Sequence, residues 1–126
     1  MPLAQALTLC ASMHTALEVV ERQLETYNAR DIAGFAACFS DDIVVMDLDT
    51  NAVRTSGLGA LREFYGAQFV RWPLQRSRVT NRQQVGEYVT DLEYITGVPD
   101  REPYFLLAIY RVRGGKIDRC WFTPRA

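Results

Sequence analysis

Histidine, lysine and cysteine are scarce in this sequence of 126 residues, which has one histidine, one lysine and three cysteines. His14 has no partner that would suggest a Ser/His/Asp or Cys/His mechanism, so it is read as an ordinary terminal residue. Cys10, Cys38 and Cys120 are odd in number and scattered, unlike a disulfide framework or a zinc site. We therefore expect no metal, reduced cysteines and, by default, a cytoplasmic protein.

Long apolar runs, basic patches and glycine-rich loops are missing as well. No run approaches the ~20 apolar residues of a membrane span, and residues 1–12 lack the basic start of a signal peptide. The net charge of −1 and the pI of about 5.8 argue against general affinity for nucleic acid or acidic membranes. Because no phosphate-binding loop is present either, we expect no cofactor and no nucleic-acid or membrane partner.

The length and composition fit one globular domain. Hydrophobic residues make up 48% of the chain and charged residues 23%, which is ordinary for such a domain. No repeat, low-complexity segment or long linker interrupts the 126 residues. We expect a single domain, with residues 1–13 as a peripheral extension.

Three helices are predicted from apolar spacing and capping residues. Residues 15–29 carry one apolar stripe. Asp31 can cap a short helix over 32–39, and Ser56 can cap a third over 57–71, which Pro73 stops. The stripe of the first helix is Leu17, Val20, Leu24 and Tyr27, and the inward face of the third is Leu58, Leu61, Phe64 or Tyr65, and Phe69.

The remaining segments read as strands. The first spans 43–48, with a short return over 53–55, and four long strands follow at about 75–85, 86–97, 103–113 and 116–123. Gly114 and Gly115 between the last two are a two-residue hairpin signal. The strand over 103–113 is apolar on both faces, so we expect both to be covered. This order predicts an α+β fold with helices on one face of a curved, mainly antiparallel sheet.

The stretch DDIVVMDLDT, residues 41–50, contains the main candidate for acid–base chemistry. Strand side chains alternate, so Asp47 shares a face with Ile43 and Val45. If that face lines a dry cavity, desolvation would raise the pKa of Asp47 toward the range useful for proton abstraction. The alternative is that the strand simply ends in water at Asp47.

A second group of carboxylates lies on the strand over 86–97. Glu87, Asp91 and Glu93 share one face, and rows of this kind are usually solvated. The opposite face mixes aromatic and small polar residues, which suits a pocket wall or a dimer face. We expect a solvated row, from which Asp91 could still assist in a site.

The segments YNARDIAGFAACFSDDIVVMD and RTSGLGALREFY, with this order of elements, resemble the nuclear transport factor 2-like superfamily. Within it the chain is similar to the SnoaL-like and ketosteroid-isomerase-like branch, over about residues 15–123. The resemblance implies a cone-like sheet wrapped around about three helices and enclosing an apolar pocket. It also implies that Asp47 matches the general-base aspartate of ketosteroid isomerases.

The chain departs from those isomerases at both positions that bind the oxyanion. Gln23 stands where they have a tyrosine and could donate one amide hydrogen bond. Ala108 stands near their protonated aspartate and cannot donate. Because losing one such donor typically costs about 10²–10³ in rate, the usual steroid isomerisation is not expected to be efficient.

Two functions follow as hypotheses. The first is a pocket enzyme, an isomerase or cyclase-like lyase, that uses Asp47 as general base and Gln23 as oxyanion donor on a small apolar carbonyl compound. The second is a non-catalytic module that binds a small ligand or associates through its sheet. Under both we expect a homodimer through the sheet face. The candidate ligand contacts are Tyr27, Phe64, Tyr65, Trp121 and Asp91.

Overall fold

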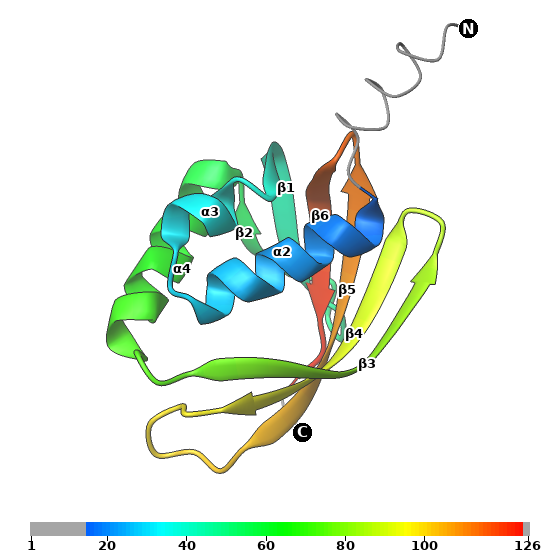
Figure 1. Cartoon of the computed structure of the whole chain (residues 1–126). Helices are drawn as coiled ribbons and strands as arrows, with labels where there is room; N and C mark the ends of the chain where they lie inside the picture. Colours follow the sequence, from blue (N-terminus) through cyan, green and yellow to red (C-terminus); the bar gives the residue numbers. More distant parts are fainter. Residues whose placement is uncertain (1–14, 125–126) are drawn as a thin grey trace, which may run out of the picture.

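The computed structural model describes residues 15–124, in which three helices lie against one face of a six-stranded sheet (Figure 1). The helices are α2 (Ala16–Asn28), α3 (Ile32–Ala36) and α4 (Leu58–Arg71). The strands are β1 (Phe39–Asp47), β2 (Val53–Ser56), β3 (Arg76–Val85), β4 (Tyr88–Thr96), β5 (Tyr104–Arg113) and β6 (Lys116–Phe122). The predicted extension over residues 1–13 lies outside the described residues.

The sheet has the order β2-β1-β6-β5-β4-β3 and curves around the helices (Figure 1). The β1–β6 pair is parallel and the other pairs are antiparallel. Register shifts interrupt the pairing of β3 with β4 and of β5 with β6, and such irregularities increase local twist. The predicted α+β class, with a mainly antiparallel curved sheet wrapped around helices, is confirmed.

Most predicted boundaries agree with the structure, with exceptions before α4 and before β1. The predicted cap of the third helix at Ser56 is wrong, because Ser56 ends β2 and Gly57 precedes α4 without a side-chain cap hydrogen bond. The second helix ends at Ala36, and β1 already begins at Phe39, which pairs with Ile117 of β6. Gly114 and Gly115 both have positive φ, 60° and 76°, between β5 and β6. Two successive positive φ values require glycine-like residues, so the predicted hairpin signal is confirmed.

The buried face of α2 is rotated from the predicted stripe. Leu17 is 40% exposed, whereas Gln23 is 6% exposed. Val19, Val20 and Tyr27 complete the buried face. The stripe was wrong because it counted only apolar residues, and this helix presents a glutamine to the interior.

The connection from α2 to α3 explains the Asn-x-x-Asp pattern at residues 28–31. Asn28 exchanges two hydrogen bonds of 2.9 Å with the backbone of Ser77 on β3. Asp31 accepts a hydrogen bond from the Gly34 N–H and so caps α3. A Cβ at Gly34 would lie 2.3 Å from the Asp31 carboxylate, so a larger residue would have to displace the carboxylate that caps the helix. The motif therefore fixes α2 against the edge strand of the sheet.

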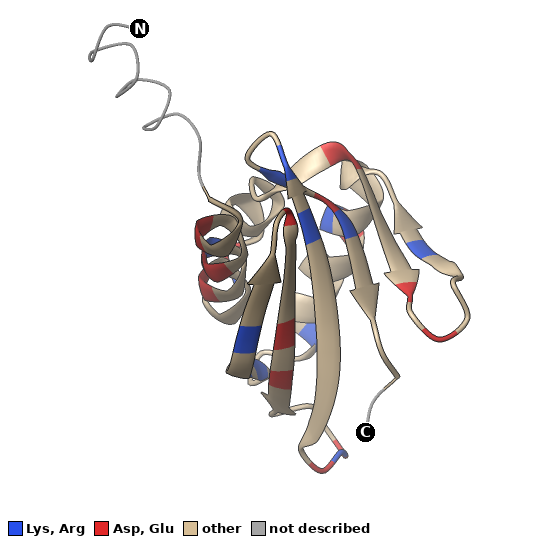
Figure 2. Ribbon diagram, turned by 90° about the vertical axis from the view of Figure 1, so that its right-hand side faces the viewer, with Lys and Arg blue, Asp and Glu red and all other residues tan. Residues whose placement is uncertain are grey.

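The outer face of the sheet, turned away from the helices, is partly open. On β5, Tyr104, Ala108 and Tyr110 face inward and are buried, but Phe105 on the outer face is 43% exposed. The expectation that β5 is covered on both faces is therefore wrong for the single chain. Figure 2 shows acidic positions, in red, along β4 and basic positions, in blue, on β5 and β6.

Candidate functional site

A cavity of about 440 Å³ lies between the helices and the inner face of the sheet. This volume is within the range of small-molecule sites, about 300–1,000 Å³. Aromatic and aliphatic side chains form much of its wall, and amide, hydroxyl and carboxyl groups are set among them. The residues used below that line this pocket are Gln23, Tyr27, Phe64, Tyr65, Gln68, Gln75, Glu93 and Tyr110.

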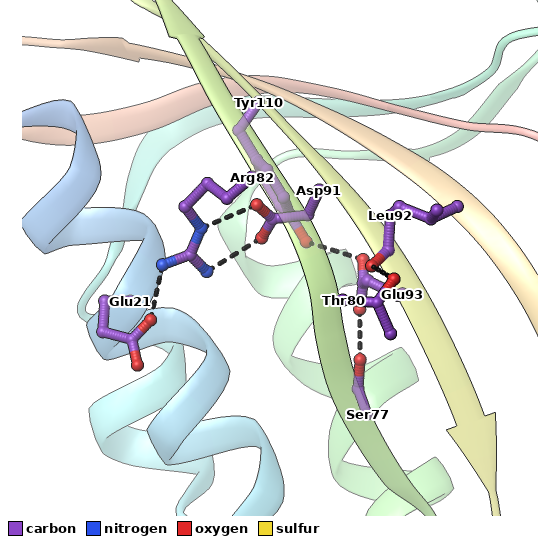
Figure 3. Close-up of polar contacts among 8 residues, drawn as sticks. All are labelled: Glu21, Ser77, Thr80, Arg82, Asp91, Leu92, Glu93 and Tyr110. Atoms are coloured by element: carbon purple, nitrogen blue, oxygen red, sulfur yellow. Dashed lines mark hydrogen bonds and ion pairs between the residues drawn. The ribbon is translucent and has the colours of Figure 1, made fainter.

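Glu93 on β4 is the carboxylate of the pocket. It is 7% exposed. Its Oε1 accepts a hydrogen bond from the Ser77 hydroxyl on β3, and its Oε2 accepts one of 3.4 Å from the Tyr110 hydroxyl on β5 (Figure 3). Three adjacent strands thus hold this carboxyl group in one orientation.

Burial raises the pKa of Glu93 from its ordinary 4.5 to about 7. Desolvation is the largest cause and the nearby charge of Asp91 adds to it, while the hydrogen bonds from Ser77 and Tyr110 act in the opposite direction. A carboxyl group with a pKa near neutrality can both take up and release a proton under ordinary conditions.

The helix side of the pocket carries a polar arrangement of its own. Gln68 on α4 donates one hydrogen bond of 2.8 Å to the Tyr27 hydroxyl and another of 2.9 Å to Oε1 of Gln75. Gln23 lies one turn before Tyr27 on α2. The pocket therefore contains polar groups on both the helices and the sheet.

Aromatic packing fixes the position of Tyr27. Its ring lies 5.3 Å from that of Phe69 and 5.8 Å from that of Phe35, measured between centroids. Desolvation by burial is the largest cause that raises the pKa values of Tyr27 and Tyr65, and the charge of Glu93 contributes. Both tyrosines therefore keep their protons at neutral pH and can donate hydrogen bonds.

Asp47 is not among the residues that line the pocket. It ends β1 beside Phe122, a lining residue of β6, and its side chain is 23% exposed. Its carboxylate accepts hydrogen bonds from Arg54, at 3.0 Å, and from the backbone N–H groups of Asp49 and Thr50. The Arg54 hydrogen bond, then that of Thr50, lowers the pKa of Asp47. The expected rise in its pKa is therefore wrong, because Asp47 closes a turn at the pocket edge.

Two predicted ligand contacts also lie away from the pocket lining. Asp91 is 1% exposed and receives two hydrogen bonds from Arg82, at 2.7 and 2.9 Å (Figure 3). Arg82 also pairs with Glu21 of α2 at 2.5 Å. Trp121 packs beside Tyr88, with ring centroids 6.3 Å apart. The structure brings the other candidates, Gln23, Tyr27, Phe64 and Tyr65, together in the lining.

Sequence reasoning grouped Glu93 correctly with Asp91 but expected both in water. The alternation of β4 identifies one common face and does not tell whether that face meets solvent or a cavity. Ser77 lies sixteen positions before Glu93 on another strand, so nothing in the sequence indicated that it would be the hydrogen-bond partner of Glu93. The solvated interpretation of this row is wrong for Asp91 and Glu93, since both are buried.

Within residues 15–124, no group of three or more His, Cys, Asp or Glu side chains is arranged to hold a metal ion. Among the same residues, no helix is long and apolar enough to cross a bilayer. The residues that line the pocket supply carboxyl, hydroxyl, amide, guanidinium and thiol groups.

A curved sheet that closes over helices around one internal pocket defines a class of small α+β pocket proteins. The SnoaL-like domain model matches residues 20–120, so the chain belongs to the SnoaL-like family. This confirms the resemblance to the nuclear transport factor 2-like superfamily and its SnoaL-like branch.

Solved structures give the same result for the fold. A cystatin-fold protein from Novosphingobium aromaticivorans is 30% identical, with a TM-score of 0.80 over 86% of this chain and 97% of its own. A candidate ketosteroid isomerase from Kribbella flavida is 19% identical (TM-score 0.74, 88% and 78% covered). A candidate polyketide cyclase from Sinorhizobium meliloti is 16% identical, with a TM-score of 0.73 over 86% of this chain and 99% of its own. A comparison with curated proteins gave no match.

Proposed function

We propose that this protein binds a small, largely apolar carbonyl compound in its pocket and catalyses a proton transfer, with Glu93 as the acid–base group. The observation that supports this most is a buried pocket carboxyl group whose pKa is raised to about 7. A general base is most effective when its pKa lies near the working pH. The similarity to a candidate ketosteroid isomerase and a candidate polyketide cyclase is in keeping with such chemistry.

The proposed step needs no cofactor. The Glu93 carboxylate removes a proton from a carbon next to the carbonyl, and the electron pair of that C–H bond moves onto the carbonyl oxygen to give an enolate. Glu93 then returns the proton at the same or a conjugated carbon. Tyr65 is the proposed donor to the enolate oxygen, because it lines the pocket and its hydroxyl keeps its proton.

The test is hydrogen–deuterium exchange into 2-tetralone, a ketone small enough for a pocket of about 440 Å³, followed by mass spectrometry in D₂O. The wild type should accelerate exchange, with a rate that rises with pH and levels off above about 7. Glu93→Gln should lower the rate by about 10²–10⁴-fold. Asp47→Asn is the matched control and should retain it. Loss of exchange in Asp47→Asn alone would return the role of base to Asp47, as the sequence predicted.

A non-catalytic binding module is the second candidate, and one observation favours it. Ser77 and Tyr110 already donate to Glu93, which suits a fixed acceptor for a ligand as well as a base. In that case 2-tetralone should raise the melting temperature of the protein and be recovered without deuterium beyond the buffer rate. Enzyme-dependent exchange would exclude this alternative.

We further propose a homodimer through the outer face of the sheet and a cytoplasmic location. The outer face offers Tyr88, Leu92 and Phe105, all at least 36% exposed. An apolar patch of this kind commonly marks an association surface. The free and buried Cys38 and Cys120 fit a reducing compartment.

A further inference from the structure

Two polar groups of α2 face the pocket without a complete set of hydrogen-bond partners. Gln23 and Tyr27 are four positions apart on one helix, so their side chains project from the same face, one turn apart. Both line the pocket, and both are buried. Neither is needed for the proton transfer proposed for Glu93.

Gln23 leaves a hydrogen-bond acceptor unused. Its side chain is 6% exposed, and its Oε1 has no hydrogen-bond partner among residues 15–124. A buried polar atom without a partner is uncommon and loses the hydrogen bond that water would have provided. A ligand that donates to this oxygen would restore that bond.

Tyr27 has a hydroxyl proton that its hydrogen bond with Gln68 does not use. Its hydroxyl oxygen accepts from Gln68, and the second hydrogen bond of the same amide nitrogen goes to Gln75. The Tyr27 hydroxyl therefore acts as an acceptor toward Gln68, and its own proton points away from that amide. Because burial raises the pKa of Tyr27, the proton stays in place at neutral pH.

We propose that Gln23 and Tyr27 together bind a hydroxyl group of the ligand. A hydroxyl is the small group that accepts and donates through a single atom. It would accept from Tyr27 and donate to Oε1 of Gln23. This inference rests on the proposed pocket function and narrows its ligand to a hydroxylated apolar compound, with the hydroxyl on the α2 side and the carbonyl toward Glu93.

The aromatic packing of Tyr27 supports recognition by a preorganised group. Its ring is held by Phe35 and Phe69, and the Arg30 guanidinium lies 5.6 Å from its centroid. Its hydroxyl therefore needs little reordering when a ligand enters, which favours affinity.

The experiment compares three probes of one shape, 2-naphthol, 2-methoxynaphthalene and naphthalene, titrated by fluorescence or NMR against the Glu93→Gln protein. This variant separates binding from catalysis. Wild-type Gln23 should favour 2-naphthol over 2-methoxynaphthalene by about tenfold, because the ether leaves the buried Oε1 unpaired. Adding Gln23→Leu should bring the ratio of the affinities for 2-naphthol and 2-methoxynaphthalene close to one. Adding Tyr27→Phe should weaken the binding of both of these oxygen-containing probes. Glu25→Gln, on the exposed side of α2, is the matched control and should keep the tenfold preference.

Three results would overturn the inference. Equal affinities for 2-naphthol and 2-methoxynaphthalene would remove the hydroxyl site and leave the binding pocket intact. A preference for the ether that depends on Gln23 would show that its amide donates, the role predicted from the sequence. Failure of all three probes to bind would count against the binding pocket itself. Thermal unfolding of each variant verifies that it is folded.

Discussion

At the scale of the residue, the chemistry of this protein depends on where one carboxylate lies relative to water. Asp47 ends β1 whereas Glu93 lies within β4, and both accept hydrogen bonds. Arg54 and backbone N–H groups stabilise the charged form of Asp47, so its pKa falls. Desolvation dominates at Glu93, so its pKa rises. The two acids are therefore suited to opposite tasks, one to closing a turn and the other to exchanging a proton.

The raised pKa of Glu93 predicts a specific dependence of stability on pH. The folded chain holds this proton up to about pH 7, whereas the unfolded chain releases it near 4.5. Between these values the native state binds more protons, so the free energy of unfolding should fall as pH rises, by up to about 3 kcal/mol. Urea unfolding at pH 5, 6, 7 and 8 measures this.

Glu93→Gln provides the control for that experiment, because an amide cannot ionise. The free energy of unfolding of the variant should lack the decline between pH 5 and 7 that Glu93 causes in the wild type. Other titrating groups contribute equally to both proteins, so the difference between the two curves isolates Glu93. Identical slopes in the two proteins would mean that the folded carboxyl group titrates like an ordinary glutamate.

At the scale of the element, β4 is held to its neighbours by side chains rather than by the backbone ladder alone. Arg82 of β3 bridges Asp91 of β4 and Glu21 of α2 (Figure 3). Ala108 of β5 lies opposite Asp91 in the register, and its small side chain leaves room on the inner face. This ion-paired group therefore joins α2, β3 and β4 immediately beside the pocket.

Removing the arginine should destabilise the fold strongly. Arg82→Met would leave Asp91, whose side chain is 2% exposed, as a buried charge without its partner. The expected loss in the free energy of unfolding at pH 7 is about 3–5 kcal/mol. The double variant Arg82→Met/Asp91→Leu should recover most of it, since the buried charge is then absent. Equal losses in the single and double variants would show that the packing of Arg82 matters more than its charge.

Local patterns in the sequence predicted the helices and strands but not which polar side chains those elements bury. The helix over 15–29, the cap at Asp31 and the pair Gly114–Gly115 depend on neighbours within a few residues, and these predictions agree with the structure. The inward rotation that buries Gln23 and the burial of Glu93 depend on residues of other elements, such as Ser77 and Gln68. The period of a strand or helix assigns residues to a face, but only tertiary packing determines what that face meets.

At the scale of the whole molecule, the sheet has one face for the ligand and one face that the chain leaves open. Inner-face residues such as Val89 and Ala108 are fully buried. On the outer face, the rings of Tyr94 and Phe105 lie 4.8 Å apart, with Leu92 nearby on β4. This division predicts that association between copies and ligand binding use opposite sides of the sheet.

The homodimer proposal is tested by sedimentation. The wild type should sediment at about twice the 14.3 kDa of one chain. Phe105→Glu or Leu92→Lys should shift it toward the monomer, because a charge would be buried in the interface. Val70→Lys, at an 82% exposed position on α4, is the control and should stay dimeric. A wild-type mass of one chain would refute the proposal.

The clamp between Asn28 and Ser77 has a consequence for how the protein would respond to an occupant. The backbone of Ser77 forms hydrogen bonds with Asn28 at the end of α2, and its hydroxyl donates one to Glu93. A ligand that displaces α2 would therefore also move the Ser77 hydroxyl, whose hydrogen bond stabilises the ionised form of Glu93. We therefore expect a ligand that shifts α2 to change the pKa of Glu93 as well.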